Sequence, residues 1–74
     1  MNANQSPSQA ALILHELNER RGEWVPMPDL CAVSGAYAVH SRCAELRTKL
    51  GLNIENKTVT APGSRTKLSF YRLL

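Results

Sequence analysis

One stretch in the middle of the chain, residues 34–50, restricts the fold more than any other. It opens with a Ser-Gly break, and its apolar residues then recur at the spacing of one helix face. These apolar residues are Val39, Cys43, Leu46 and Leu50. Gly51 follows, where a left-handed residue commonly ends a helix. We therefore expect an amphipathic helix over about 36–50, with this stripe in the core.

The other faces of this expected helix are small, polar or basic. Tyr37, Ser41, Ala44, Glu45 and Thr48 lie opposite the stripe, Arg42 and Lys49 lie on one flank, and His40 and Arg47 lie on the other. A buried stripe backed by such a face suits a helix that enters a DNA major groove. Many ordinary surface helices share this pattern, so the neighbouring segments must decide.

The segment before it predicts a first helix over about 8–21. Ser6 can cap that helix, and Pro7 suits its first position. Arg20 and Arg21 fall in its expected last turn, where they complement the helix dipole. Its core stripe comprises Ala10, Ile13, Leu14 and Leu17.

Two shorter elements are expected between these helices. Residues 23–26 favour an extended segment, with Trp24 at the edge of the core. Residues 28–34 favour a short helix whose apolar side carries Leu30, Cys31 and Val33. A short helix, a turn that contains glycine and a longer, more basic helix form the helix-turn-helix unit.

After Gly51 the apolar period changes from that of a helix to that of a strand. Residues 52–56 and 68–74 alternate as strands, and residues 57–67 between them predict a long, basic loop. We expect an antiparallel hairpin. Tyr71 and Leu73 are the favoured inward pair beside Ile54, but Leu68 and Phe70 compete for that face, so the register stays open.

The length of 74 residues allows one small domain, expected over 7–74 after a disordered tail at 1–6. No apolar run approaches the roughly 18 residues that cross a bilayer. The first residues lack the basic start and apolar core of a signal peptide. A cytoplasmic protein without membrane contact is therefore expected.

The charge is unevenly distributed along the chain. The net charge is +3, yet residues 1–37 hold two basic and four acidic side chains, whereas residues 38–74 hold seven and two. The positive charge is therefore confined to the central helix and everything after it. Such asymmetry indicates a polyanionic partner.

Chemistry of other kinds has little support in the sequence. Cys31 and Cys43 are best explained as small apolar side chains in a reducing compartment, with a disulfide as a lesser alternative. A zinc site that combined them with His15 and His40 matches no known ligand spacing. No motif for catalysis, phosphate binding or a nucleophile occurs, so we expect neither an enzyme nor a cofactor or small-molecule substrate.

Three short motifs carry a resemblance to a known family. They are Ser41-Arg42-Cys43-Ala44-Glu45-Leu46-Arg47, Gly51-Leu52-Asn53-Ile54 and Phe70-Tyr71-Arg72-Leu73. Together with the order of expected elements, they resemble the small winged helix-turn-helix proteins of bacteria and phages, over essentially the whole chain from residue 7. One departure is Cys43, where the pattern more often has a branched aliphatic residue.

The resemblance implies an α+β fold with a three-helix core, a C-terminal two-stranded wing and a short strand after the first helix. It implies binding of double-stranded DNA, in transcription regulation or in phage DNA transactions. The implied contacts come from the helix at 36–50 in the major groove and the wing at 57–67 on the backbone or minor groove. The candidate residues are Tyr37, His40, Ser41, Arg42, Glu45, Arg47, Lys49, Lys57, Arg65 and Lys67.

Alternatives stay open for both the residues and the function. Arg42 or Arg47 can instead pair with Glu45 or Glu55 and serve the structure. The basic face can also dock an acidic protein partner, because winged helices are used in both ways. A protein this small reads few base pairs alone, so a homodimer on a two-fold site is a further expectation.

Overall fold

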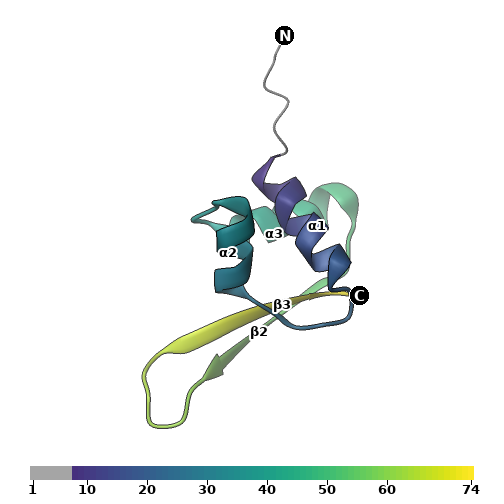
Figure 1. The fold of residues 1–74 in the computed structure, drawn as a ribbon. Helices are drawn as coiled ribbons and strands as arrows, with labels where there is room; N and C mark the ends of the chain where they lie inside the picture. Colours follow the sequence, from purple (N-terminus) through teal and green to yellow (C-terminus); the bar gives the residue numbers. More distant parts are fainter. Residues whose placement is uncertain (1–7) are drawn as a thin grey trace.

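The computed structural model describes residues 8–74. They form α1 (Gln9–Glu19), β1 (Val25–Pro26), α2 (Met27–Ser34), α3 (Val39–Leu50), β2 (Ile54–Thr60) and β3 (Lys67–Leu73). The strands make one antiparallel sheet in the order β1-β3-β2, with the helices on one side of it (Figure 1). The expected α+β class, three helices, short strand and hairpin are confirmed within this part of the chain. The expected tail at 1–6, and the start of the domain at Pro7, lie outside the described residues.

Helix α1 is shorter than the expected helix over about 8–21, because it begins at Gln9 and ends at Glu19. Its N-cap is Ser8, whose hydroxyl oxygen accepts a hydrogen bond from the Ala11 amide at 3.1 Å. The capping roles expected for Ser6 and Pro7 fall outside the described residues. The helix ends at Glu19, so the expected end at Arg21 is wrong.

Arg20 therefore acts outside the last turn of α1. Its guanidinium pairs with Asp29 at 2.9 Å, and it also lies within 4 Å of Glu16 and Glu23. The hydrogen bond to Asp29 is the main reason that the pKa of Arg20 is raised. These contacts tie the end of α1 to α2. Carboxylates on three separate segments thus replace the expected dipole role of Arg20.

The connection between α2 and α3 is longer than expected. α2 ends at Ser34, and its C-cap is Gly35, which has the left-handed φ of +72° that favours glycine. α3 then begins only at Val39, because the Ala36 amide bonds to the Ser34 hydroxyl at 3.1 Å and Ala36 is buried in the turn. Tyr37 lies in this turn and is fully exposed. Gly51 ends α3 in the left-handed conformation, as predicted.

The register of the hairpin, which the sequence left open, places Tyr71 and Leu73 in the core. Ile54 lies opposite Leu73, and the ladder continues to Thr60 opposite Lys67. Tyr71 and Leu73 are each 1% exposed, whereas Leu68 is 42% exposed on the other face. At the hairpin end both strands extend beyond the expected bounds, and only residues 61–66 form the turn. At its other end β2 begins at Ile54, two residues later than expected. β1 pairs with β3 through Val25 and Pro26.

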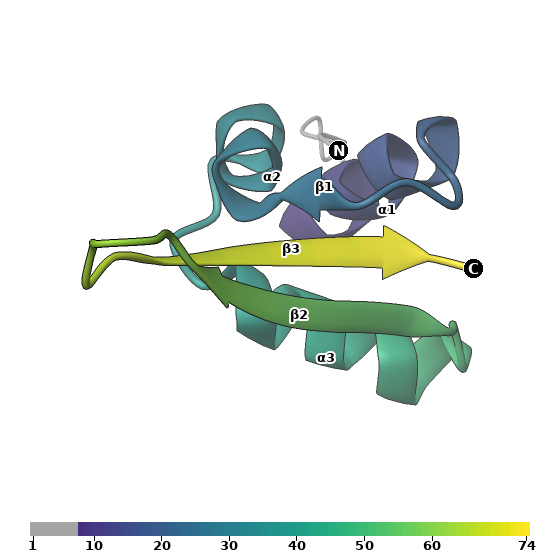
Figure 2. The same ribbon diagram turned by 90° about the horizontal axis from the view of Figure 1, so that it is seen from below.

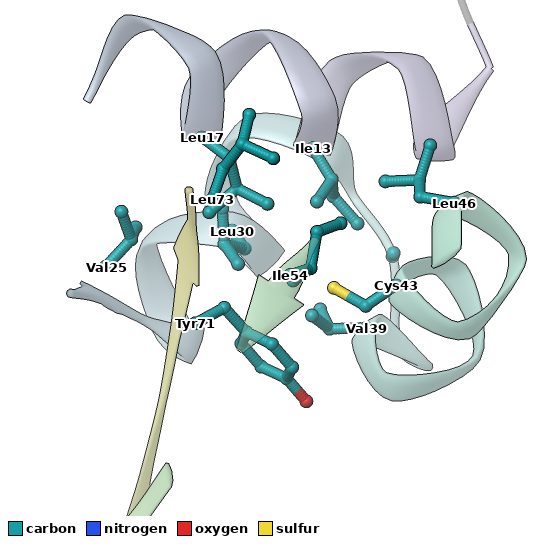
Figure 3. Close-up of a cluster of buried hydrophobic side chains, with 11 residues drawn as sticks. Ile13, Leu17, Val25, Leu30, Val39, Cys43, Leu46, Ile54, Tyr71 and Leu73 are labelled. Atoms are coloured by element: carbon teal, nitrogen blue, oxygen red, sulfur yellow. The ribbon is translucent and has the colours of Figure 1, made fainter. Parts of the chain in front are cut away.

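The core lies between the helices and the inner face of the sheet. Figure 3 shows the Tyr71 ring beside Val39, with its hydroxyl at the edge of the cluster. The buried apolar residues are Ile13, Leu17, Val25, Leu30, Ala36, Val39, Cys43, Leu46, Ile54, Tyr71 and Leu73. No helix in residues 8–74 is long and apolar enough to cross a membrane.

Two residues expected in the core are exposed. Leu50 is 59% exposed, because it is the last residue of α3 and lies on the rim of a groove beside Leu14. Val33 is 43% exposed, because α2 packs through Leu30 and Ser34, one turn apart, and this turns Val33 to solvent. The core is therefore smaller than the apolar pattern suggested.

Candidate nucleic-acid interface

The outer face of α3 is exposed and small, as the sequence predicted. Ser41, Ala44 and Thr48 are exposed on it. The Thr48 hydroxyl donates to the Ala44 carbonyl oxygen at 2.9 Å, one turn earlier, which holds that side chain against the helix. Tyr37 stands apart from this face, in the turn before α3. The face offers little side-chain bulk, so a flat partner can approach the helix backbone closely.

One flank of α3 faces α1. Arg42, Glu45 and Lys49 line a groove there, together with residues of α1. The Arg42 Nη1 donates to both carboxylate oxygens of Glu45, each at 3.2 Å. Arg42 thus forms the ion pair that was the alternative to a DNA contact. Its Nε is buried and has no hydrogen-bond partner within residues 8–74.

The other flank of α3 faces the sheet. The Arg47 Nε donates to the Ile54 carbonyl oxygen at 2.8 Å, which connects α3 to the first residue of β2. His40 Nδ1 contacts the Tyr71 hydroxyl, and the two rings lie 5.5 Å apart at their centroids. Burial is the main reason that the pKa of Tyr71 rises to about 12. Arg47 and His40 therefore join secondary-structure elements.

The hairpin presents three of the candidate cations. Lys57 lies within β2, Arg65 lies in the turn, and Lys67 begins β3. All three are exposed. The expectation that 57–67 is one long loop is wrong, because the ladder continues to Thr60 and Lys67. Figure 1 shows that the hairpin tip extends beyond the helices. Arg65 belongs to that tip, whereas Lys57 lies opposite Phe70, the residue that also pairs with Pro26 of β1.

Both carboxylates of the basic half of the chain are paired. Glu45 pairs with Arg42, and Glu55 with Arg72 on the neighbouring strand. Within residues 8–74, no carboxylate pairs with Arg47, Lys49, Lys57, Arg65 or Lys67. The pair between Glu55 and Arg72 was not predicted from the sequence, although a register with Ile54 opposite Leu73 places these two residues directly opposite. The exposed cations among them are thus available to an external anion; they are Lys49, Lys57, Arg65 and Lys67.

The cysteines and histidines do not assemble into a site. Cys31 and Cys43 are free thiols, with Cys43 in the core and Cys31 half-buried. Burial raises the pKa of Cys43 to about 11, although the charge of Arg47 lowers it slightly. Among the described residues, no group of three or more His, Cys, Asp or Glu side chains is arranged to hold a metal ion.

Comparison of the chain with models of protein families, with curated proteins and with solved structures found no match. The candidate interface therefore rests on the geometry of α3, the hairpin and their unpaired cations.

Proposed function

We propose that this protein is a winged helix-turn-helix protein that binds double-stranded DNA, in transcription regulation or phage DNA transactions. In this proposal α3 enters the major groove, and the β2–β3 hairpin is the wing that contacts the backbone or minor groove. The observation that carries the proposal is the set of exposed cations on α3 and the hairpin that have no carboxylate partner within residues 8–74. The order of elements, with β3 between β1 and β2, supports it.

We assign different roles to the candidate residues according to their exposure and their partners within the fold. Lys49, Lys57, Arg65 and Lys67 are exposed and suited to phosphate oxygens, which give affinity and salt dependence. Ser41 and Tyr37 are exposed, their side chains make no hydrogen bond within residues 8–74, and they are suited to base edges. Arg42, Arg47, Glu45 and His40 have partners within the fold. A DNA contact by any of these four stays a prediction, and it requires that the residue give up its present partner for a DNA group.

A salt titration tests the proposal. Binding of a short labelled duplex of random sequence is measured by fluorescence anisotropy at increasing NaCl concentration. Each phosphate contact contributes about −0.9 to the slope of log K against log salt. Combined Lys57→Gln, Arg65→Gln and Lys67→Gln substitutions should therefore reduce the steepness of that slope by about 2–3.

Single-charge variants supply the matched control. Lys49→Gln removes one cation from α3, whereas Arg21→Gln removes one from the end of α1, where it bonds to Asn18. Lys49→Gln should reduce the steepness of the slope by about 0.9, and Arg21→Gln should leave it unchanged. Undetectable duplex binding at low salt, or equal effects of these two variants, would refute the proposal. Selection from a random duplex pool then shows whether a preferred site exists.

A further inference from the structure

The outer face of the sheet, opposite the helices, carries an apolar and aromatic strip. Figure 2 shows the sheet from this side, with the helices behind it. We define the outer sheet face as Trp24, Pro26, Glu55, Lys57, Val59, Leu68, Phe70 and Arg72. The register makes the strip continuous, because Phe70 lies between Pro26 and Lys57, and Leu68 lies opposite Val59. Val59 and Leu68 are each 42% exposed. Large side chains on this face are thus left open to solvent.

Cations cover the aromatic part of this face. The Lys57 Nζ lies 4.4 Å from the Trp24 ring centroid and 5.5 Å from that of Phe70. The Arg72 guanidinium carbon lies 4.2 Å from the Trp24 centroid. The one carboxylate on this face, Glu55, is bound by Arg72. Lys57 therefore leaves a free positive charge beside an apolar strip.

We propose that the outer sheet face binds an acidic protein segment that carries apolar side chains. The carboxylates would meet Lys57, and the apolar side chains would cover Val59, Leu68 and Phe70. Charge complementarity selects this occupant: the outer sheet face of a second copy would bring no unpaired carboxylate to Lys57, because its Glu55 is bound by Arg72. Single-stranded nucleic acid needs open aromatic rings on which its bases can stack. On this face, however, Lys57 and Arg72 lie over the Trp24 ring, and the exposed large apolar side chains, Val59 and Leu68, are aliphatic. This proposal and the DNA proposal share Lys57 but no other named residue, and α3 packs on the other face of the sheet.

Trp24 is the only tryptophan of the chain, so its fluorescence reports directly on this face. The full chain is titrated with a short synthetic peptide in which Asp alternates with Leu and Phe. We expect saturable binding with a change in Trp24 emission. Leu68→Ser and Lys57→Gln should each weaken that binding by about two- to fivefold. Arg21→Gln serves as the charge-matched control and should leave binding unchanged.

Two further ligands and one variant separate the alternatives. The same peptide with Asn in place of Asp should bind more weakly, whereas equal binding would overturn the role of charge. A dT oligonucleotide is titrated in the same way. If it changes Trp24 emission with saturation and the peptide does not, the face binds nucleic acid and the proposal is wrong. Absence of any peptide-dependent change in the folded wild-type protein would also overturn it. Leu68→Ser keeps every cation, so its duplex DNA affinity should be unchanged, which distinguishes failure here from failure of the DNA proposal.

Discussion

Replacing Arg47 by Met separates a structural role of this side chain from a role in binding DNA. Met keeps an unbranched apolar stem but removes the Nε donor that the Ile54 carbonyl accepts at 2.8 Å. A hydrogen bond from a charged donor contributes about 1.5–3 kcal/mol to stability. Because Arg47 is only half-buried, water can reach the carbonyl in the variant, and we expect a loss of about 1–2 kcal/mol. In a domain of this size each kcal/mol lowers the Tm by about 4–8 °C.

Urea unfolding followed by circular dichroism measures this loss. The midpoint should fall with an unchanged m-value, since the surface exposed on unfolding is the same. Lys49→Met is the matched control, because Lys49 lies two residues later on α3 and is exposed. Its free energy of unfolding should change by less than about 0.5 kcal/mol. If Arg47→Met is as stable as Lys49→Met but loses more duplex affinity, the assignment of Arg47 to the structure is wrong.

Three further variants or conditions test the fold. Ser8→Ala removes the N-cap of α1 and should lower the free energy of unfolding by about 1 kcal/mol in urea titrations, whereas no change would contradict the cap. Gly35→Ala should cost about 1–2 kcal/mol through backbone strain alone, since no atom lies within 4 Å of the added Cβ; an unchanged midpoint would exclude that strain. Stability should also fall above pH 9, because burial raises the pKa of Cys43 from 9.0 to about 11 and that of Tyr71 from 10.0 to about 12. In this pH range the unfolded chain binds fewer protons than the folded chain, so the free energy of unfolding should fall by about 2 kcal/mol between pH 8 and pH 10. Cys43→Val should remove most of this pH dependence.

The local patterns predicted the elements because each depends on residues close in sequence. The stripe of Val39, Cys43 and Leu46 needs only the helical period, and Gly51 needs only its own conformational freedom. The change to an alternating pattern after Gly51 likewise indicated the hairpin. The hairpin is longer than expected because Thr58 and Thr60 continue the ladder although both are exposed, so burial does not mark them.

Most of the side-chain contacts join segments that are distant in the sequence, so local patterns predicted these contacts less well than they predicted the helices and strands. Tyr71 and Phe70 are both apolar, and only the pairing with Asn56 and Lys57 decides that Tyr71 turns inward. The carbonyl that accepts from Arg47 belongs to Ile54, across the turn at Gly51. Glu45 was placed among the candidate contacts, although its spacing from Arg42 already allowed the observed pair.

The far half of the hairpin has no share in the core. Between Asn56 and Thr60 every residue of β2 is exposed, and the buried positions of β3 begin only at Tyr71. Its amides should therefore exchange hydrogen through local opening, with free energies below that of global unfolding. Exchange at Thr58 should be insensitive to Arg47→Met, whereas exchange at Cys43 should accelerate. The hairpin tip can then adjust to the shape of a partner while the three helices keep their packing.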